Sequence, residues 1–393
     1  SRWSNILVGY DRRDFTLAQR LLTENNVILD YLHKILIPQS NIFGVFNDHF
    51  PIAKSILDPF SNAVSIIVNL CVVICAWLVR KKHSVITLGI LFYYASHVLE
   101  SSFIPLELYY EHRNYAAVFG IAIVIAYLIV LCFESKVMSR RVKGALLTSF
   151  FLWLSLTIFV CWQEVRLWSA PLQQAAYWHQ YSPESIRSRN HLGEVLTVYS
   201  RFDDASNVYR KTSGLYEDDL VGQFLLFQLS CYVESYSEDD LNSLRKMLPT
   251  SKYSLEVVSV LKSIITNVLS GNCSKNNKEV VIELIDGLLK NDNYKRNYLE
   301  LNILASRMMD IDRRWLDSYQ YLRSAYEINP RYDIAIGLGE KALYLGDVVQ
   351  AKRLIDRIGR YCSNDLRYWC HQNKLQIESL NILYNNYIEH ENK

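Results

Sequence analysis

Four long apolar runs between residues 61 and 162 constrain the fold of this chain more than any other feature. Their limits are 61–79, 84–98, 116–133 and 144–162. A bilayer core about 30 Å thick needs roughly 20 apolar residues in a helix, and the four runs approach that length, 84–98 being the shortest. One such run could be a buried core helix, but four in succession favour a membrane. Since lipid accepts only helices and closed barrels, we expect about four transmembrane helices.

Basic residues predict the orientation of these helices. Lys and Arg cluster in 80–83, after the first run, and in 136–143, after the third. Both clusters fall on one side if the runs alternate, and the positive-inside rule assigns that side to the cytoplasm. Segments 1–60, 99–115 and 163–393 are then expected on the outer side.

Residues 1–60 contain no run that is apolar throughout. The stretch 21–36 mixes apolar positions with Glu24, Asp30, His33 and Lys34, and it stops before Pro38. This pattern predicts a helix that lies at the membrane interface or lines a cavity. We therefore expect 1–60 to be an outer-face interfacial and loop segment of the membrane domain.

From residue 163 onward the chain reads as amphipathic helical segments with short polar breaks. Two stretches, 186–219 and 332–365, carry a glycine followed twelve residues later by an alanine, as the spacing of tetratricopeptide repeats requires. The pattern predicts an all-α chain, in which a polytopic bundle precedes an extracytoplasmic repeat solenoid over 163–393. Such a solenoid would bind a protein partner or acceptor in its concave face. Alternatively, its helices pack on the membrane part or dimerise.

Segment 97–115 concentrates ionisable residues between two apolar runs. Such side chains are costly near lipid unless paired or hydrated, so they suggest a functional site. The alternative is a solvated loop with an interfacial belt of tyrosines. The charged residues are Glu100, Glu107, Glu111, His97, His112 and Arg113, and the tyrosines are Tyr109, Tyr110 and Tyr115.

The eight cysteines divide evenly between the two parts of the chain. Four lie in apolar runs, where packing explains them. The other four can pair in three ways outside the cytoplasm. From proximity in the sequence we predict Cys362–Cys370 and Cys231–Cys273. We expect no metal site and no cofactor, and the net charge of +2 gives no global basic field for nucleic acid.

Two motifs resemble the integral-membrane GT-C glycosyltransferases of the transmembrane-and-tetratricopeptide-repeat O-mannosyltransferase type and their bacterial relatives. Stretch 20–38, with Arg20, Thr23, Tyr31 and Pro38, is similar to that family's Arg-x-x-Thr…Tyr…Pro stretch. Stretch 103–115 is similar to its Pro…Glu-Arg-x-x-Tyr element, with altered spacing. The order of parts, membrane helices before repeats, also matches.

The resemblance implies sugar transfer from a polyprenyl-phosphate donor to a protein or glycan hydroxyl on the outer face of a bacterial inner membrane. The residues that it suggests for donor binding are Arg113, His112, Glu111, Tyr115 and Arg20. In that family the catalytic carboxylate lies in an N-terminal outer loop without a counterpart here. The catalytic residues are thus unknown, and we expect the chain to begin after that loop. The alternative is a non-catalytic, membrane-anchored repeat scaffold for cell-envelope assembly.

Overall fold

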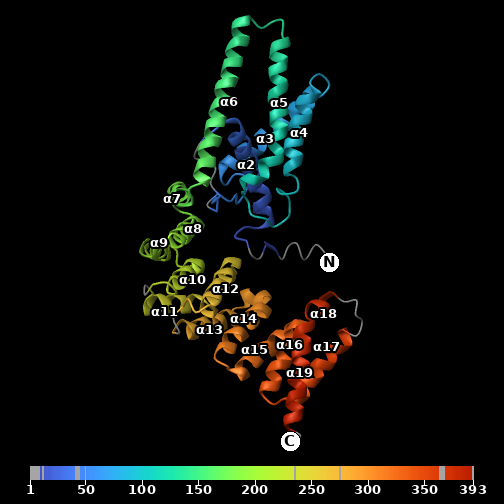
Figure 1. Cartoon of the computed structure of the whole chain (residues 1–393). Helices are drawn as coiled ribbons and strands as arrows, with labels where there is room; N and C mark the ends of the chain where they lie inside the picture. Colours follow the sequence, from blue (N-terminus) through green and yellow to red (C-terminus); the bar gives the residue numbers. More distant parts are fainter. Residues whose placement is uncertain are drawn as a thin grey trace. The chain divides into compact units, whose positions relative to one another are not determined.

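The computed structural model of the chain describes residues 9–10, 13–39, 45–48, 50–233, 236–273, 276–362 and 368–391. These residues form helices and connecting segments, and no strand occurs among them (Figure 1). The all-α prediction is therefore confirmed. The chain divides into two compact units, residues 1–199 and 200–393, which are considered separately below.

Three helices of the first unit are long and apolar enough to cross a membrane. They are α3 (Phe60–Val79), α5 (Asn114–Glu134), which the short helix η2 (Glu111–Arg113) precedes, and α6 (Arg140–Trp168). Most of their side chains are not buried within the protein, as expected of helices that face lipid. These helices indicate a membrane protein.

The expected fourth span is shorter than the sequence suggested. The run at 84–98 forms α4 (Ser84–His97), which has 14 residues and a length of about 21 Å at 1.5 Å per residue. That length does not reach across a hydrocarbon core of about 30 Å. We therefore correct the expectation of about four spans to three spanning helices with a shorter apolar helix, which packs against α5.

Helix α2 (Leu17–Leu36) is part of the bundle and packs on α3. A capping box starts it, because the Thr16 hydroxyl accepts from the Gln19 backbone while the Gln19 side chain accepts from the Thr16 N–H. Its face toward α3 is polar: Asn26 accepts a hydrogen bond from Ser65 at 2.7 Å, and Asn69 donates to the Asn25 carbonyl at 3.0 Å. These hydrogen bonds thus hold the amphipathic helix α2 against the apolar helix α3.

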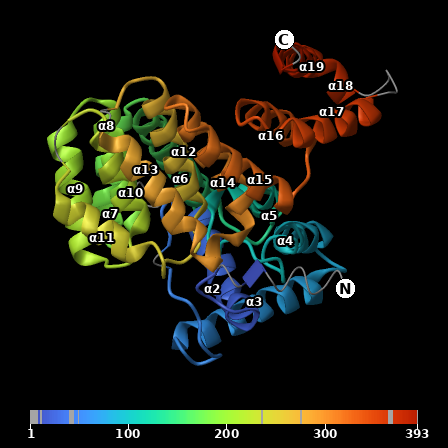
Figure 2. The same ribbon diagram turned by 90° about the horizontal axis from the view of Figure 1, so that it is seen from below.

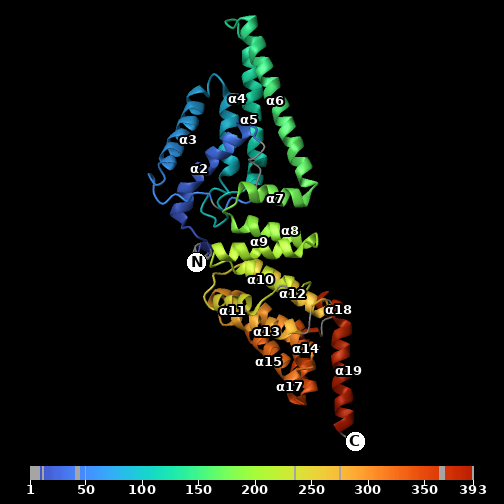
Figure 3. The same cartoon turned by 90° about the vertical axis from the view of Figure 1, so that its left-hand side faces the viewer.

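The connections between the helices of the first unit lie at its two ends. The α3–α4 and α5–α6 connections lie at one end, and the segment between α4 and α5 lies at the other, since consecutive helices run in opposite directions (Figures 1 and 3). Helices α7 (Pro171–Tyr181) and α8 (Ile186–Val198) also belong to this unit. The compact units divide after residue 199. The domain boundary expected after residue 162 stays a prediction.

The second unit is a succession of helices in which neighbours pack side by side (Figure 2). Buried aliphatic side chains form its core, including Leu261, Ile264 and Leu338. Its elements are α9 (Phe202–Leu215), α10 (Leu220–Leu229), α11 (Glu238–Met247), α12 (Leu255–Leu269), α13 (Asn276–Leu289), η3 (Asp292–Asn297), α14 (Tyr298–Ile311), α15 (Trp315–Ile328), α16 (Tyr332–Tyr344), α17 (Val348–Cys362), α18 (Tyr368–Gln372) and α19 (Lys374–Glu391).

The expected repeat at 332–365 coincides with the helical pair α16 and α17. Gly339 is buried in α16 and Ala351 in α17. Gly346 forms the turn between them with a φ of 76°, a conformation that glycine adopts without strain. The other stretch, 186–219, covers α8 and α9, which belong to different units. The tetratricopeptide assignment of both stretches stays a prediction.

Candidate functional site

Charged side chains gather where α2 approaches the segment between α4 and α5. We call this region, residues 13–36 and 97–113, the charged mouth. Its segment 97–113 lies at the end of the first unit opposite the α3–α4 and α5–α6 connections (Figure 3). The charged residues of segment 97–115 and of α2, more than 60 positions apart in the sequence, thus come together in one place.

Arg20 of α2 forms hydrogen bonds to the segment that follows α4. Its side chain is fully buried, and its Nε donates to the Ser102 carbonyl at 3.0 Å. Nη1 donates to the Leu106 carbonyl at 2.5 Å, and Nη2 donates to the Glu100 carbonyl. Nη2 also lies 3.0 Å from Glu24 Oε1. Since these partners occupy the guanidinium, Arg20 holds the loop in place and is not presented to a donor phosphate.

Glu24 is a carboxyl group buried within this region, with 3% of its surface exposed. Burial raises the pKa of Glu24 to about 7, and the opposing effect of the Arg20 charge is smaller. Desolvation of the charged form therefore outweighs the ion pair, so Glu24 titrates near neutral pH.

Arg113 is also held by neighbouring loop residues. Its Nε lies 2.9 Å from Glu100 Oε2, and its Nη1 donates to the Glu107 carbonyl at 2.6 Å. The guanidinium carbon lies 5.3 Å from the centre of the Tyr110 ring. Its side chain is 7% exposed, so a phosphate could reach it only if these contacts opened.

Lys34 lies between two carboxylates. Its Nζ is 2.9 Å from Glu111 Oε1 and 3.8 Å from Asp30 Oδ2. The Tyr109 hydroxyl donates to Asp30, and Lys34 Nζ lies 4.8 Å from the centre of the Tyr109 ring. This second cluster joins the C-terminal part of α2 to η2, the short helix before α5, and it places Glu111 in an ion pair.

The two remaining donor-binding candidates lie on the surface. His112 is exposed, with its ring 5.0 Å from the Tyr110 ring. Tyr115 is 80% exposed and makes an edge contact with Phe119. The five candidates therefore do not line one common cavity: three are paired within the mouth and two face outward.

Glu107 and His97 take positions that sequence reasoning did not assign. Glu107 lies 3.4 Å from Arg13 and 3.0 Å from Arg187 of α8, which ties the start of the extramembrane helices to the mouth. His97 is buried, with its ring centre 5.5 Å from that of Tyr31. The charge density of 97–115 singled out both residues, but their partners are too distant in sequence for spacing to identify them.

A cavity of about 420 Å³ lies beside the mouth. Its lining combines polar side chains with an aromatic ring and two prolines, a mixture typical of small-molecule sites. The lining residues are Asn26, Leu29, Asp30, His33, Phe50, Pro51, Pro59 and Ser61. Asp30 belongs both to this cavity and to the Lys34 cluster, so the cavity and the charged mouth share this residue.

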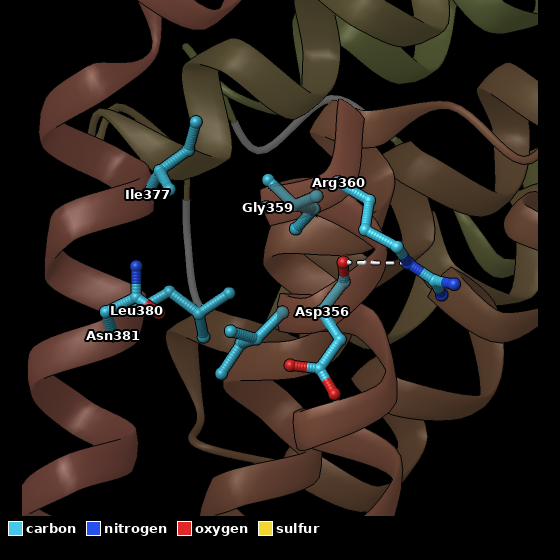
Figure 4. Close-up of a pocket in the computed structure, with 8 residues that line it drawn as sticks. Asp356, Gly359, Arg360, Ile377, Leu380 and Asn381 are labelled. Atoms are coloured by element: carbon cyan, nitrogen blue, oxygen red, sulfur yellow. Dashed lines mark hydrogen bonds between the residues drawn. The ribbon is translucent and has the colours of Figure 1, made fainter. Parts of the chain in front are cut away.

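A larger hollow of about 600 Å³ lies between α17 and α19 (Figure 4). Ile377 and Leu380 of α19 face Gly359 and Asp356 of α17 across it. Arg360 stands at its edge and donates from Nε to the Asp356 carbonyl at 3.3 Å. Its lining combines aliphatic side chains with Asp356, Arg360 and Asn381, a mixture that suits a peptide side chain.

The second unit contains two disulfides, Cys231–Cys273 and Cys362–Cys370. They join the residues that we paired by proximity. Cys71, Cys75, Cys132 and Cys161 are free thiols. Among the described residues, no group of three or more His, Cys, Asp or Glu side chains is placed to hold a metal ion.

Comparison with known proteins does not assign this chain to a family. No protein-family model matches the chain, and no curated protein matches it significantly. The side chains of the charged mouth and the cavity beside it are the features of this chain that point to a function.

Proposed function

We propose that this chain belongs to a membrane glycosyltransferase, and that the cavity beside the charged mouth receives the sugar of a polyprenyl-phosphate donor. The observation that carries the proposal is the position of Asp30. Asp30 lines the cavity, and its carboxylate joins the Lys34 cluster of α2, which packs on the apolar helix α3. Ionisable groups at such a position are costly, which favours a role in function.

The chemistry of the cavity fits a glycosyl group on a lipid carrier. Asp30, Asn26 and Ser61 offer hydrogen-bonding groups for sugar hydroxyls, and Phe50 offers an apolar surface for the face of a sugar ring. A prenyl chain would lie along the apolar helices, of which α3 begins beside the cavity at Phe60. The proposed donor contact thus moves from Arg113 to Asp30.

A second candidate is a membrane-anchored helical scaffold for cell-envelope assembly. The hollow between α17 and α19 favours it, because its volume and its aliphatic lining residues suit part of a protein partner. The two functions are compatible, since an acceptor protein could dock on the second unit. A scaffold alone, however, would not bind a lipid-linked sugar.

Binding of a fluorescent polyprenyl-phosphate sugar to the purified protein in detergent tests the transferase proposal. Asp30→Asn keeps an oxygen that can accept from Tyr109 but removes the charge. Since a hydrogen bond to a charged group contributes about 1.5–3 kcal/mol, the variant is expected to bind roughly ten- to a hundredfold more weakly.

Asp239→Asn changes an exposed carboxylate in the first turn of α11 and serves as the matched control. It should bind as the wild type does. Saturable binding that Asp30→Asn leaves unchanged would remove the cavity from the donor site. Absence of binding by the folded wild type would favour the scaffold.

A further inference from the structure

Seven Lys and Arg side chains lie at the end of the first unit opposite the charged mouth. We call them the basic end. Glu134 is the one acidic residue in segments 77–86 and 130–146, which leaves a formal charge of +6 with His83 neutral. The seven residues are Arg80, Lys81, Lys82, Lys136, Arg140, Arg141 and Lys143.

The fold brings these residues together from two connections. His83 Nδ1 lies 3.3 Å from the Tyr127 hydroxyl, which fixes the start of α4 beside the last third of α5. The α3–α4 and α5–α6 connections are consequently at the same end (Figures 1 and 3). Seven residues separate Tyr127 from Glu134, about 10 Å along a helix, so the second connection lies farther along the bundle.

The cations of the basic end have no carboxylate partner among the described residues. No ion pair involves any of the seven, and Lys81, Lys82, Arg140 and Arg141 are exposed. By contrast, Arg13, Arg20, Lys34 and Arg113 at the mouth each pair with a glutamate. The protein thus balances charge at one end of the bundle and leaves it unbalanced at the other.

Exposed apolar side chains accompany these charges. Val137, between Lys136 and Arg140, is 96% exposed, and Leu78 is 71% exposed. The Arg80 guanidinium carbon lies 4.1 Å from the centre of the Trp77 ring, and Trp77 is itself exposed. Cations with apolar stems, beside an exposed tryptophan at the ends of membrane-crossing helices, suit the headgroup region of a bilayer.

We propose that the basic end binds the phosphate headgroups of anionic phospholipids in the leaflet that it faces. Electrostatic attraction to such a leaflet acts on every Lys or Arg near its surface, and one charge is equivalent to about a fivefold change in binding. The apolar neighbours add contact with the acyl boundary. This interaction is independent of donor binding at the mouth.

The test uses the full chain in nanodiscs of phosphatidylcholine containing a small fraction of phosphatidylglycerol, with retained lipid identified by native mass spectrometry. A variant with Lys81, Lys82, Lys136, Arg140 and Arg141 changed to Gln is compared with a control. The control changes five exposed cations of the second unit, Lys211, Lys246, Arg307, Lys352 and Arg353, to Gln. Intact disulfides and thermal unfolding verify that each protein is folded.

The wild type and the control should retain phosphatidylglycerol in preference to phosphatidylcholine. In the basic-end variant the ratio of retained phosphatidylglycerol to phosphatidylcholine should fall at least tenfold. Changing the three lysines, Lys81, Lys82 and Lys136, to Arg should preserve it, because charge is what matters. Equal preference in the wild type and the Gln variant would overturn the proposal. Full competition by millimolar inorganic phosphate would also overturn it, since that result indicates a free-phosphate pocket.

Discussion

At the scale of single residues, two arginines link the parts of the charged mouth. Arg20 donates to three loop carbonyls, and Arg113 pairs with Glu100. Both contribute charge where burial makes charge costly, and neighbouring groups offset that cost. The sequence identified both residues as unusual, but their partners lie as far as 86 positions away, so their structural role could not be predicted.

The buried Glu24 carboxyl makes stability depend on pH. Its pKa is raised from an ordinary value of 4.5 to about 7, so the unfolded chain loses this proton first. The contribution is fully present below about pH 4.5 and is lost as pH rises through about 7. We predict that Glu24→Gln abolishes this decrease in thermal stability with rising pH, measured in detergent. Glu107→Gln, a half-exposed control, should still show the decrease. An unchanged decrease in Glu24→Gln would exclude Glu24 as its source.

At the scale of elements, the bounds of α3 and α5 follow closely from local sequence, whereas α6 extends beyond its apolar run at both ends. The runs at 61–79 and 116–133 became α3 and α5, with ends displaced by two residues at most. Apolar content is a local property and predicts such helices well. The run at 84–98 likewise ends within one residue of α4, and its length already falls short of the roughly 20 residues that a spanning helix needs.

Close packing of α4 on α5 depends on two glycines. A Cβ built on Gly89 would lie 2.5 Å from the Gly120 carbonyl oxygen, and Gly120 meets the Gly89 carbonyl in the same way. Gly120→Ala is expected to cost about 1–3 kcal/mol by overpacking. Gly144→Ala in α6, where a Cβ meets open space, is the matched control. Thermal unfolding in detergent compares them, and equal midpoints would refute close packing at this contact.

At the scale of the whole molecule, free cysteines and disulfide-bonded cysteines lie in different compact units. The free thiols belong to the apolar helices of the first unit, and both disulfides belong to the second. Disulfides persist in oxidising compartments, so this division supports the expectation that the second unit is outside the cytoplasm. Sequence proximity suggested the pairs, whereas the break between units after Tyr199 depends on packing that no local pattern encodes.

The two disulfides should differ in their effect on stability. Cys231–Cys273 spans 42 residues and Cys362–Cys370 spans 8. The chain-entropy relation gives losses of about 4 and about 2.5 kcal/mol for removing them. Denaturant unfolding of the two Cys→Ser double variants should therefore rank Cys231/Cys273 as the more damaging, with Cys161→Ser as a neutral control. The reverse order would show that loop closure does not dominate.

The most direct test of the account is photolabelling with a polyprenyl-phosphate sugar that carries a photoreactive group on the sugar. We predict cross-links in peptides that include residues 26–33 or 50–61, from the lining of the cavity beside the mouth. Excess unlabelled donor should prevent them, and Asp30→Asn should reduce them. Competable labelling confined to the second unit, or light-dependent labelling that the donor does not compete, would contradict the account.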